Sequence, residues 1–149
     1  MKQKKWTYLM IFVLLLATAC FACLHFMRRP NVPENSLLVI GQGKEVTVLI
    51  EKLPHMKAEG VLVNGKGEEK EVSEDAVVLT EVLKAAGIDQ DSVSSITLTA
   101  SDEYSASYGI DEAERVFFVQ DEEHQISAFI FGDPNAKRRI HDVNRVEAE

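Results

Sequence analysis

Cysteine is scarce in this chain, and its placement excludes several kinds of chemistry. Among 149 residues the only cysteines are Cys20 and Cys23, near the N-terminus. The rest of the sequence therefore has no disulfide framework, no thiol nucleophile and no thiolate metal ligand. Its stability has to come from an ordinary hydrophobic core. Residues 36–149 are enough for one such core and too few for two domains.

Charged residues are absent from a long run near the N-terminus. No Asp, Glu, Lys or Arg occurs from residue 6 to residue 27. About 20 apolar residues are needed to cross a bilayer as a helix, so residues 1–29 are predicted to be a membrane anchor or signal segment. Three lysines precede the run and only two arginines follow it. The excess of positive charge before the run predicts a cytoplasmic N-terminus, with the C-terminal part outside the cytoplasm.

Three kinds of N-terminal segment fit this pattern. The first is a retained single-pass anchor. The second is a cleaved signal peptide, for which Ala17-Thr18-Ala19 supplies the small-x-small exit. The third is a bacterial lipoprotein, because Ala17-Thr18-Ala19-Cys20 resembles a lipobox with lipid on Cys20. The apolar run continues from residue 21 to residue 27, whereas a lipoprotein normally turns polar after its cysteine, so the anchor is favoured.

Acidic residues are missing from the first 30 positions and abundant afterwards. All 24 follow Pro30, with 11 of the 16 Lys and Arg, so this part carries a formal charge of 11 − 24 = −13. Nucleic acid is thereby excluded as a partner, since its backbone is bound through cationic contacts. The excess of carboxylates indicates solubility near an anionic surface or, alternatively, a cationic ligand.

A linker is predicted at residues 30–35, and short strands with one clear helix are predicted after it. Leu79, Val82, Leu83 and Ala86 recur at helical spacing, which predicts a helix over residues 76–86. Ser73 or Asp75 is the expected N-cap, and Gly87 the expected end. Alternating or β-branched runs predict strands at residues 37–40, 46–50, 60–64, 96–100, 104–108, 116–119, 126–131 and 140–146. The pattern is typical of an α+β fold with mainly antiparallel sheets.

Three segments of the second half share their order and spacing with a known family. Residues 79–88 look like the pattern Leu-x-x-Leu-Leu-x-x-Ala-Gly-Ile, and residues 96–113 are close to a strand, a Ser-x-Asp-Gly-Tyr turn, a second strand and a Glu-Ala helix start. Residues 137–147 look like a closing strand Lys-x-Val-Lys-x-Val-x-x-Ile-Glu. In these segments the chain resembles the molybdopterin-binding domain of the sulfite oxidase type. The resemblance implies that residues 36–149 form a trimmed version of that fold.

The departures from this family bear on activity. Active members hold molybdenum through a cysteine thiolate ahead of the helix region, and residues 36–149 contain no cysteine. The stretch Val61 to Val72, where long loops would wrap the pterin, has no aromatic residue and no arginine, and Glu103 replaces the usual glycine of the turn. We therefore expect no enzyme, no molybdenum, no pterin and no other cofactor. The alternative is a redox accessory or cofactor-binding oxidoreductase subunit completed by a partner.

The one concentrated basic patch outside the N-terminal segment is Lys137-Arg138-Arg139. In the resembled family, basic residues near this strand approach the cofactor. Tyr104 and Tyr108 share one face of their predicted strand, and these five residues together define the expected ligand groove. A charged edge strand or a contact with lipid headgroups is the simpler explanation of the basic patch. No nucleophile motif or metal-ligand spacing accompanies it. The sequence predicts a membrane-anchored, non-catalytic binding module for a small anionic ligand or a protein partner.

Overall fold

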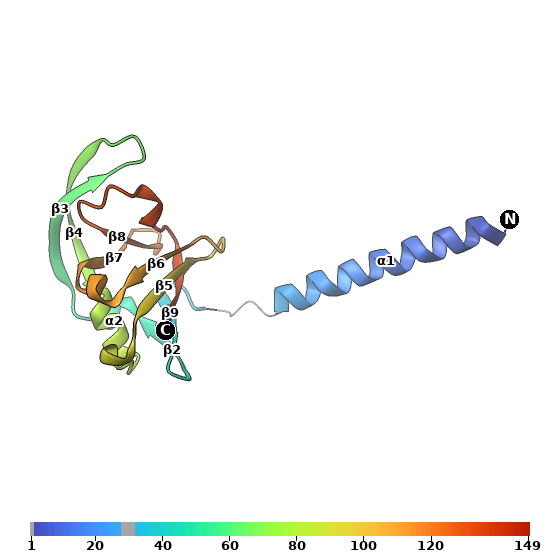
Figure 1. Ribbon diagram of the computed structural model, residues 1–149, viewed down its shortest axis with the longest axis horizontal. Helices are drawn as coiled ribbons and strands as arrows, with labels where there is room; N and C mark the ends of the chain where they lie inside the picture. Colours follow the sequence, from blue (N-terminus) through green and yellow to red (C-terminus); the bar gives the residue numbers. More distant parts are fainter. Residues whose placement is uncertain (1, 28–31) are drawn as a thin grey trace. The chain divides into compact units, whose positions relative to one another are not determined.

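The computed structural model describes residues 2–27 and 32–149, which belong to two compact units divided after Asn31 (Figure 1). Helix α1 (Lys2–Met27) makes up the first unit. Its stretch Lys5–Leu24 is long and apolar enough to cross a membrane, as a retained anchor or a signal sequence would be. The two arginines used in the orientation argument, and the start of the predicted linker at residues 30 and 31, lie outside the described residues.

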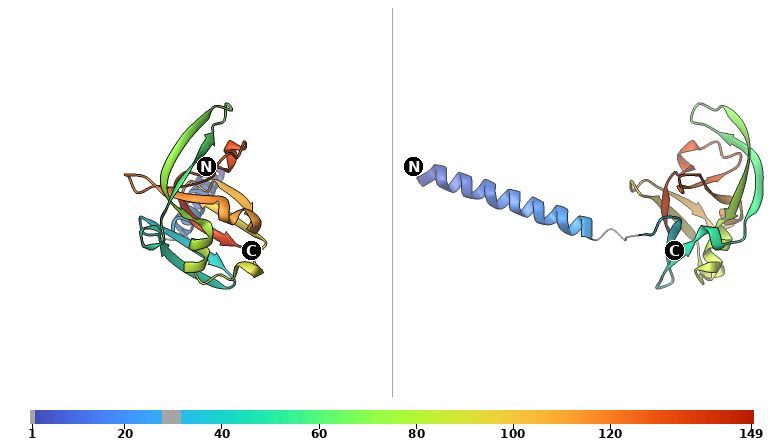
Figure 2. Two further views of the ribbon diagram at one scale, coloured as in Figure 1. Left: turned by 90° about the vertical axis from the view of Figure 1, so that its left-hand side faces the viewer. Right: turned by 180° about the vertical axis from the view of Figure 1, so that it is seen from behind.

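The second unit is an α+β domain built on two sheets, and every strand pairing but one is antiparallel (Figure 2). The five-stranded sheet has the order β2-β1-β9-β5-β6, with β1 and β9 parallel. The four-stranded sheet has the order β3-β4-β7-β8. The larger sheet contains β1 (Ser36–Gly41), β2 (Lys44–Leu49), β5 (Ser95–Ala100), β6 (Ser105–Gly109) and β9 (Val143–Ala148). The smaller contains β3 (Met56–Val63), β4 (Glu69–Val78), β7 (Val116–Gln120) and β8 (Ile126–Ile130).

One hydrophobic core joins the two sheets. Leu37, Ile96 and Leu98 from the larger sheet and Val77 and Phe118 from the smaller one are almost fully buried in the same cluster. The predicted alternation at residues 96–100 is confirmed for Ile96 and Leu98, which are buried in the core, whereas Thr99 on the face expected to be polar is buried as well. Helix α2 (Leu79–Ala85) adds three buried side chains to this core. Single turns of 3₁₀-helix connect the strands at Ile50–Lys52, Gln90–Ser92 and Ala136–Arg138, and a longer one does so at Ile110–Arg115.

Several predicted elements have different bounds in the structure. The helix expected at residues 76–86 begins only at Leu79, because residues 76–78 belong to β4 and pair with β7. The N-cap is Val78, which makes no side-chain cap hydrogen bond, so the caps expected at Ser73 and Asp75 are wrong. Gly87 follows the helix in the left-handed region, with φ of +69°, and ends the helix as predicted.

The last strand and the β3–β4 hairpin also differ from expectation. The strand predicted at residues 140–146 is shifted to Val143–Ala148, and Ile140 makes only an isolated bridge with Ala128. The short strand expected at residues 60–64 is the end of an eight-residue strand that pairs along its whole length with β4. This long, curved hairpin is the most prominent feature of the smaller sheet (Figure 1).

Candidate functional site

The smaller sheet is curved. Its outer face, which points away from the hydrophobic core, carries a second apolar cluster. The ring centroid of Phe131 lies 5.3 Å from that of Phe117 and 5.2 Å from that of Phe129. The backbone N–H of Gly132 donates a hydrogen bond of 2.7 Å to the carbonyl of Val61, which joins the end of β8 to β3. Gly60 permits this approach, because a Cβ atom there would lie 2.5 Å from Cγ of Phe131. The curl holds the β3–β4 hairpin over the outer face of β7 and β8.

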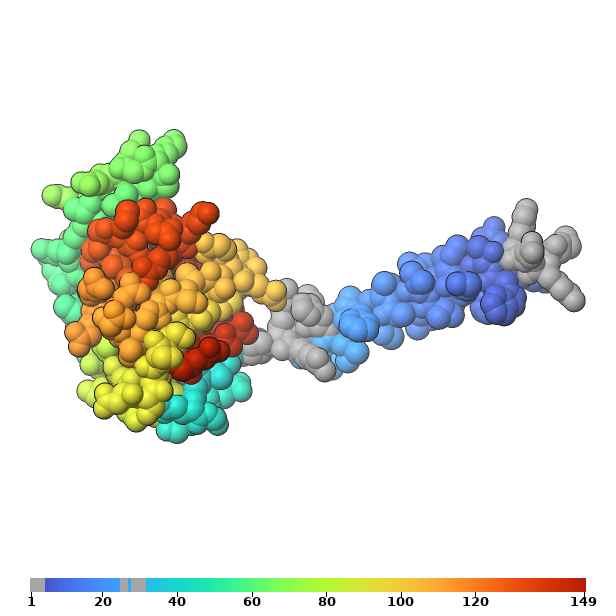
Figure 3. Space-filling model, in the orientation of Figure 1, coloured from blue at the N-terminus to red at the C-terminus, as the bar shows by residue number. Residues whose placement is uncertain are grey.

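A groove of about 560 Å³ opens between the hairpin and strands β7 and β8. This volume lies within the range of about 300 to 1,000 Å³ that is usual for ligand sites. The turn that joins β3 and β4 projects beyond the neighbouring segment at one end of the domain (Figure 3). Leu62, Val72, Val119 and Phe129 give the groove its apolar surface. Its polar lining residues are Asn64, Glu68, Glu69, Lys70, Glu74, Asp121, Ser127, Arg139 and His141.

The donors of the groove come from three separate parts of the chain. The guanidinium carbon of Arg139 lies 5.9 Å from the ring centroid of Phe129, so the cation rests over an aromatic face. The hydroxyl of Ser127 and Nδ1 of His141 lie 3.2 Å apart, within hydrogen-bond distance. Lys70 reaches the groove from β4. In the described part of the chain, neither Lys70 nor Arg139 forms an ion pair, so both cations are available to a ligand.

Two of the four carboxylates that line the groove hold its local structure. Glu68 accepts a hydrogen bond of 2.6 Å from the side-chain amide of Asn64. Asp121 accepts hydrogen bonds from the backbone N–H groups of residues 123 and 125, which closes the β7–β8 turn. The side-chain carboxylates of Glu69 and Glu74 form no hydrogen bond or ion pair with any other residue that the structure describes. These two side chains are therefore free for a ligand.

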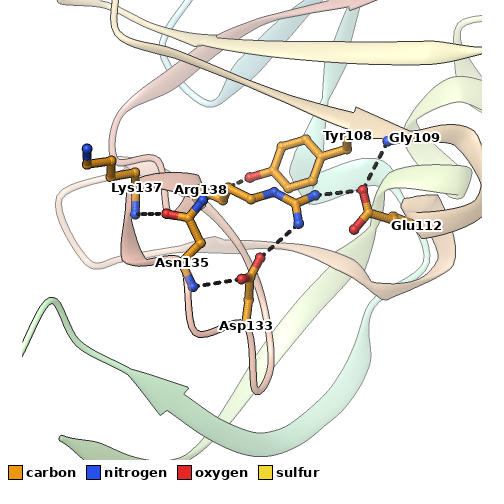
Figure 4. A network of polar contacts seen from close by, with 7 residues as sticks. All are labelled: Tyr108, Gly109, Glu112, Asp133, Asn135, Lys137 and Arg138. Atoms are coloured by element: carbon orange, nitrogen blue, oxygen red, sulfur yellow. Dashed lines mark hydrogen bonds and ion pairs between the residues drawn. The ribbon is translucent and has the colours of Figure 1, made fainter. Parts of the chain in front are cut away.

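The predicted site residues Tyr108 and Arg138 meet in a separate network of polar contacts (Figure 4). Arg138 donates hydrogen bonds of 2.6 Å to Glu112 and 3.1 Å to Asp133. Its guanidinium carbon lies 4.7 Å from the ring centroid of Tyr108, whose hydroxyl donates to the carbonyl of Arg138. The two hydrogen bonds from Arg138 to carboxylates are charge-assisted, and bonds of this kind are the strong ones in proteins. Arg138 thus fastens the segment around it to the rest of the domain and has little capacity left for a ligand.

The pKa values of this network follow from its contacts. Burial raises the pKa of the Tyr108 hydroxyl to about 12, against an opposing effect of the Arg138 charge. The hydrogen bond from Arg138 lowers the pKa of the Glu112 carboxyl below its usual value. The same hydrogen bond raises the pKa of the Arg138 guanidinium. All three shifts favour the protonation states present at neutral pH, which is characteristic of a structural ion pair.

The predicted basic patch therefore separates into three environments. Lys137 is exposed, and its ammonium forms no ion pair among the described residues. Arg138 is committed to two carboxylates, whereas Arg139 lines the groove. Tyr104 is 45% exposed and donates a hydrogen bond of 2.7 Å to the carbonyl of Lys137. Tyr108 is buried within the core cluster, so only Arg139 of the five predicted residues reaches the groove.

A molybdenum cofactor does not fit the groove. The family resemblance implies that such a cofactor needs a cysteine thiolate, and both cysteines of the chain belong to α1. The charged and polar groups that a cofactor would meet in the groove include nitrogen and oxygen atoms of lysine, arginine, histidine, serine and carboxylate side chains, and no sulfur. Soft thiolate ligands and hard oxygen ligands suit different metals. Among the side chains that the structure describes, no three of His, Cys, Asp or Glu are grouped to hold a metal ion.

Comparison with known proteins adds no family to this description. No family model matches the sequence, and no curated protein gives a significant match.

Proposed function

We propose that this chain is a membrane-anchored binding module that holds its ligand in the groove of the smaller sheet, outside the cytoplasm. The observation that carries the proposal is the pairing, within about 560 Å³, of an apolar surface with unpartnered charged side chains. Ligand sites combine these two properties, because apolar contact supplies affinity while a few polar groups fix orientation. The 20-residue apolar stretch of α1 supplies the anchor.

The proposal includes the absence of catalysis. Nucleophilic catalysis needs a base within hydrogen-bond reach of the nucleophile and a third group that orients the base. In the groove, the Ser127 hydroxyl lies 3.2 Å from Nδ1 of His141. Among the described residues no carboxylate contacts the His141 ring, so the pair lacks its orienting group. Binding is what the remaining side chains support.

We also retain the relationship to the sulfite oxidase type as a proposal for the origin of the domain. The order of helix α2, strand β5, the turn after it, strand β6 and the 3₁₀-helix at Ile110–Arg115 agrees with the order of the resembled segments. Glu103 has φ of +70°, the conformation that glycine adopts most readily, at the position where the family has glycine. The trimmed domain would then have kept the scaffold and lost the metal ligand.

Site-specific photocrosslinking in the native membrane tests the proposed function. A compact aliphatic diazirine amino acid at Ser127, small enough to leave the groove open, is placed in the groove, and the matched control carries it at Ser107, an exposed serine of β6. Both serines make one side-chain hydrogen bond, to His141 and Thr97 respectively. We expect an adduct at Ser127 that the control does not form and that Arg139→Ala weakens. Equal labelling at both positions, or none at Ser127, contradicts the proposal.

A further inference from the structure

Strand β4 has a long backbone edge without a partner. Over residues 69–76 it pairs with β3 on one side, whereas β7 pairs only with residues 76–78 on the other. Within the described chain, no backbone hydrogen bond reaches residues 69–75 from the β7 side. Seven extended residues span roughly 23 Å. An unpaired edge of this length is a template for another strand.

This free edge faces the groove. Strand β7 runs beside β4 only as far as Ala76. It then ends at Gln120 and turns back into β8, so it does not continue beside residues 69–75. Val119 and Asp121, at the end of β7, line the groove together with Val72 and Glu74 of β4. A strand laid in the groove would therefore meet the unpaired main chain of β4 on one side. Its side chains would meet the apolar surface around Val72 and Phe129.

Charge around the groove favours a basic occupant. The hairpin from residue 57 to residue 75 contains six acidic and three basic residues, and the β7–β8 turn adds Asp121, Glu122 and Glu123. The carboxylates of Glu69 and Glu74 line the groove and form no hydrogen bond or ion pair with another side chain or backbone group among the described residues. Arg139 is placed over Phe129, where it can donate to a peptide carbonyl. Complementary charge of this kind directs association as well as orientation.

We propose that the groove takes an extended, net basic polypeptide segment of a partner protein, which adds as a strand along residues 69–75 of β4. This inference rests on the proposed function, since it names the ligand class of the same groove. Main-chain hydrogen bonds to β4 would supply affinity, and alternate side chains on the groove surface would supply specificity. The segment would be paired on one side only, which leaves its outer edge open.

A random library of twelve-residue peptides displayed on phage provides the probe. The target is the full chain in nanodiscs, with counter-selection on Ser127→Trp, which fills the groove, and with Ser107→Trp as the matched control. We expect selected peptides to be net basic, to bind the control normally and to lose binding to Ser127→Trp. Double substitution Glu69→Lys and Glu74→Lys is expected to weaken the same peptides.

Methylation of peptide nitrogens distinguishes strand addition from other modes of binding. An amide that points toward β4 donates one hydrogen bond, so its methylation should weaken binding by roughly tenfold, the equivalent of one net hydrogen bond. Methylation of the alternate amides should have little effect. Peptides that are insensitive to this alternation, selected peptides that are net acidic, or no selection above Ser127→Trp each overturn the inference. If Ser127 nevertheless crosslinks a small molecule in the membrane, the proposed function stands and only the strand fails.

Discussion

Tyr108 and Arg138 are joined twice, once through the ring and once through the main chain. The guanidinium carbon lies 4.7 Å from the ring centroid, and the tyrosine hydroxyl donates to the carbonyl of the same arginine. The guanidinium is also held by Glu112, from the 3₁₀-helix at Ile110–Arg115, and by Asp133, five residues earlier in the same connection between β8 and β9. The pair ties strand β6 to the segment that carries Arg139 into the groove.

Replacement of Arg138 by alanine should destabilise the domain. The change removes two charge-assisted hydrogen bonds and leaves Glu112 and Asp133, both largely buried, without their partner. We expect the free energy of unfolding to fall by about 2 to 3 kcal/mol. Urea denaturation of the full chain in detergent, followed by circular dichroism, measures the loss. Lys137→Ala serves as the adjacent control, with a change within about 0.5 kcal/mol. Equal effects at the two positions would refute the structural role of Arg138.

Stability should decline in strong alkali through Tyr108. Because its pKa is raised from 10.0 to about 12 in the folded domain, the folded state binds its proton more tightly than the unfolded state. The corresponding stability is present below pH 10 and is lost as the pH rises toward 12, by about 2 to 3 kcal/mol in total. Unfolding titrations at a series of pH values test this.

The control for that titration compares slopes rather than absolute stabilities. Tyr108→Phe also removes the hydrogen bond to the Arg138 carbonyl, so its stability at neutral pH falls as well. Its alkaline slope should nevertheless be shallower than that of the parent chain. A parent slope in Tyr108→Phe would show that other groups cause the alkaline loss.

Gly60→Ala should both destabilise the domain and open the groove. The added Cβ would lie 2.5 Å from the ring of Phe131, so either the ring or β3 has to move. Overpacking of this kind costs about 1 to 3 kcal/mol. The matched control is Gly65→Ala, where no atom lies within 4 Å of the added Cβ. Thermal unfolding of both variants makes the comparison, and similar melting temperatures would contradict the close contact of β3 with Phe131.

Glu103→Gly should stabilise the domain. Glu103 occupies the left-handed region, with φ of +70°, where a side chain costs roughly 1 kcal/mol relative to glycine. The gain is partly offset because glycine increases the entropy of the unfolded chain. We expect a rise in the free energy of unfolding of up to about 1 kcal/mol. Asp102→Gly in the same turn should have the opposite sign, because Asp102 accepts a hydrogen bond from the backbone of Tyr104.

The sequence predicted the core strands well because burial alternates along them. Ile96 and Leu98 occupy one face of β5 and are buried, as their spacing requires. Strand β4 gave no such signal. Its residues 69–75 include five charged side chains and only one apolar residue, because both faces of the hairpin are solvated there. The helix was predicted to begin too early because Ala76 and Val77 continue its apolar run, whereas pairing with β7 holds them in a strand.

The groove was beyond prediction for a different reason. Its lining comes from β3, β4, the β7–β8 hairpin and residues 139–141, and no local motif links these segments. The predicted basic patch contains one groove residue, Arg139. The adjacent Arg138 lies instead against Glu112 and Asp133, so neighbouring positions in the sequence have different surroundings. Alternation at residues 126–131 could have placed Ser127 and Phe129 on one face. Only the curl of the sheet brings that face under Val72.

Strand β9 lies at the centre of the larger sheet, between β1 and β5, although it is the last strand in the chain. The β1–β2 hairpin and the β5–β6 hairpin therefore have no contact within the sheet until residues 143–148 are inserted between them. During synthesis, the larger sheet cannot close while these residues are still inside the ribosome or a translocation channel. Closure joins positions about 100 residues apart, so it should be the slow step of folding. The domain would therefore remain open enough to pass through a translocation channel until its final strand emerges.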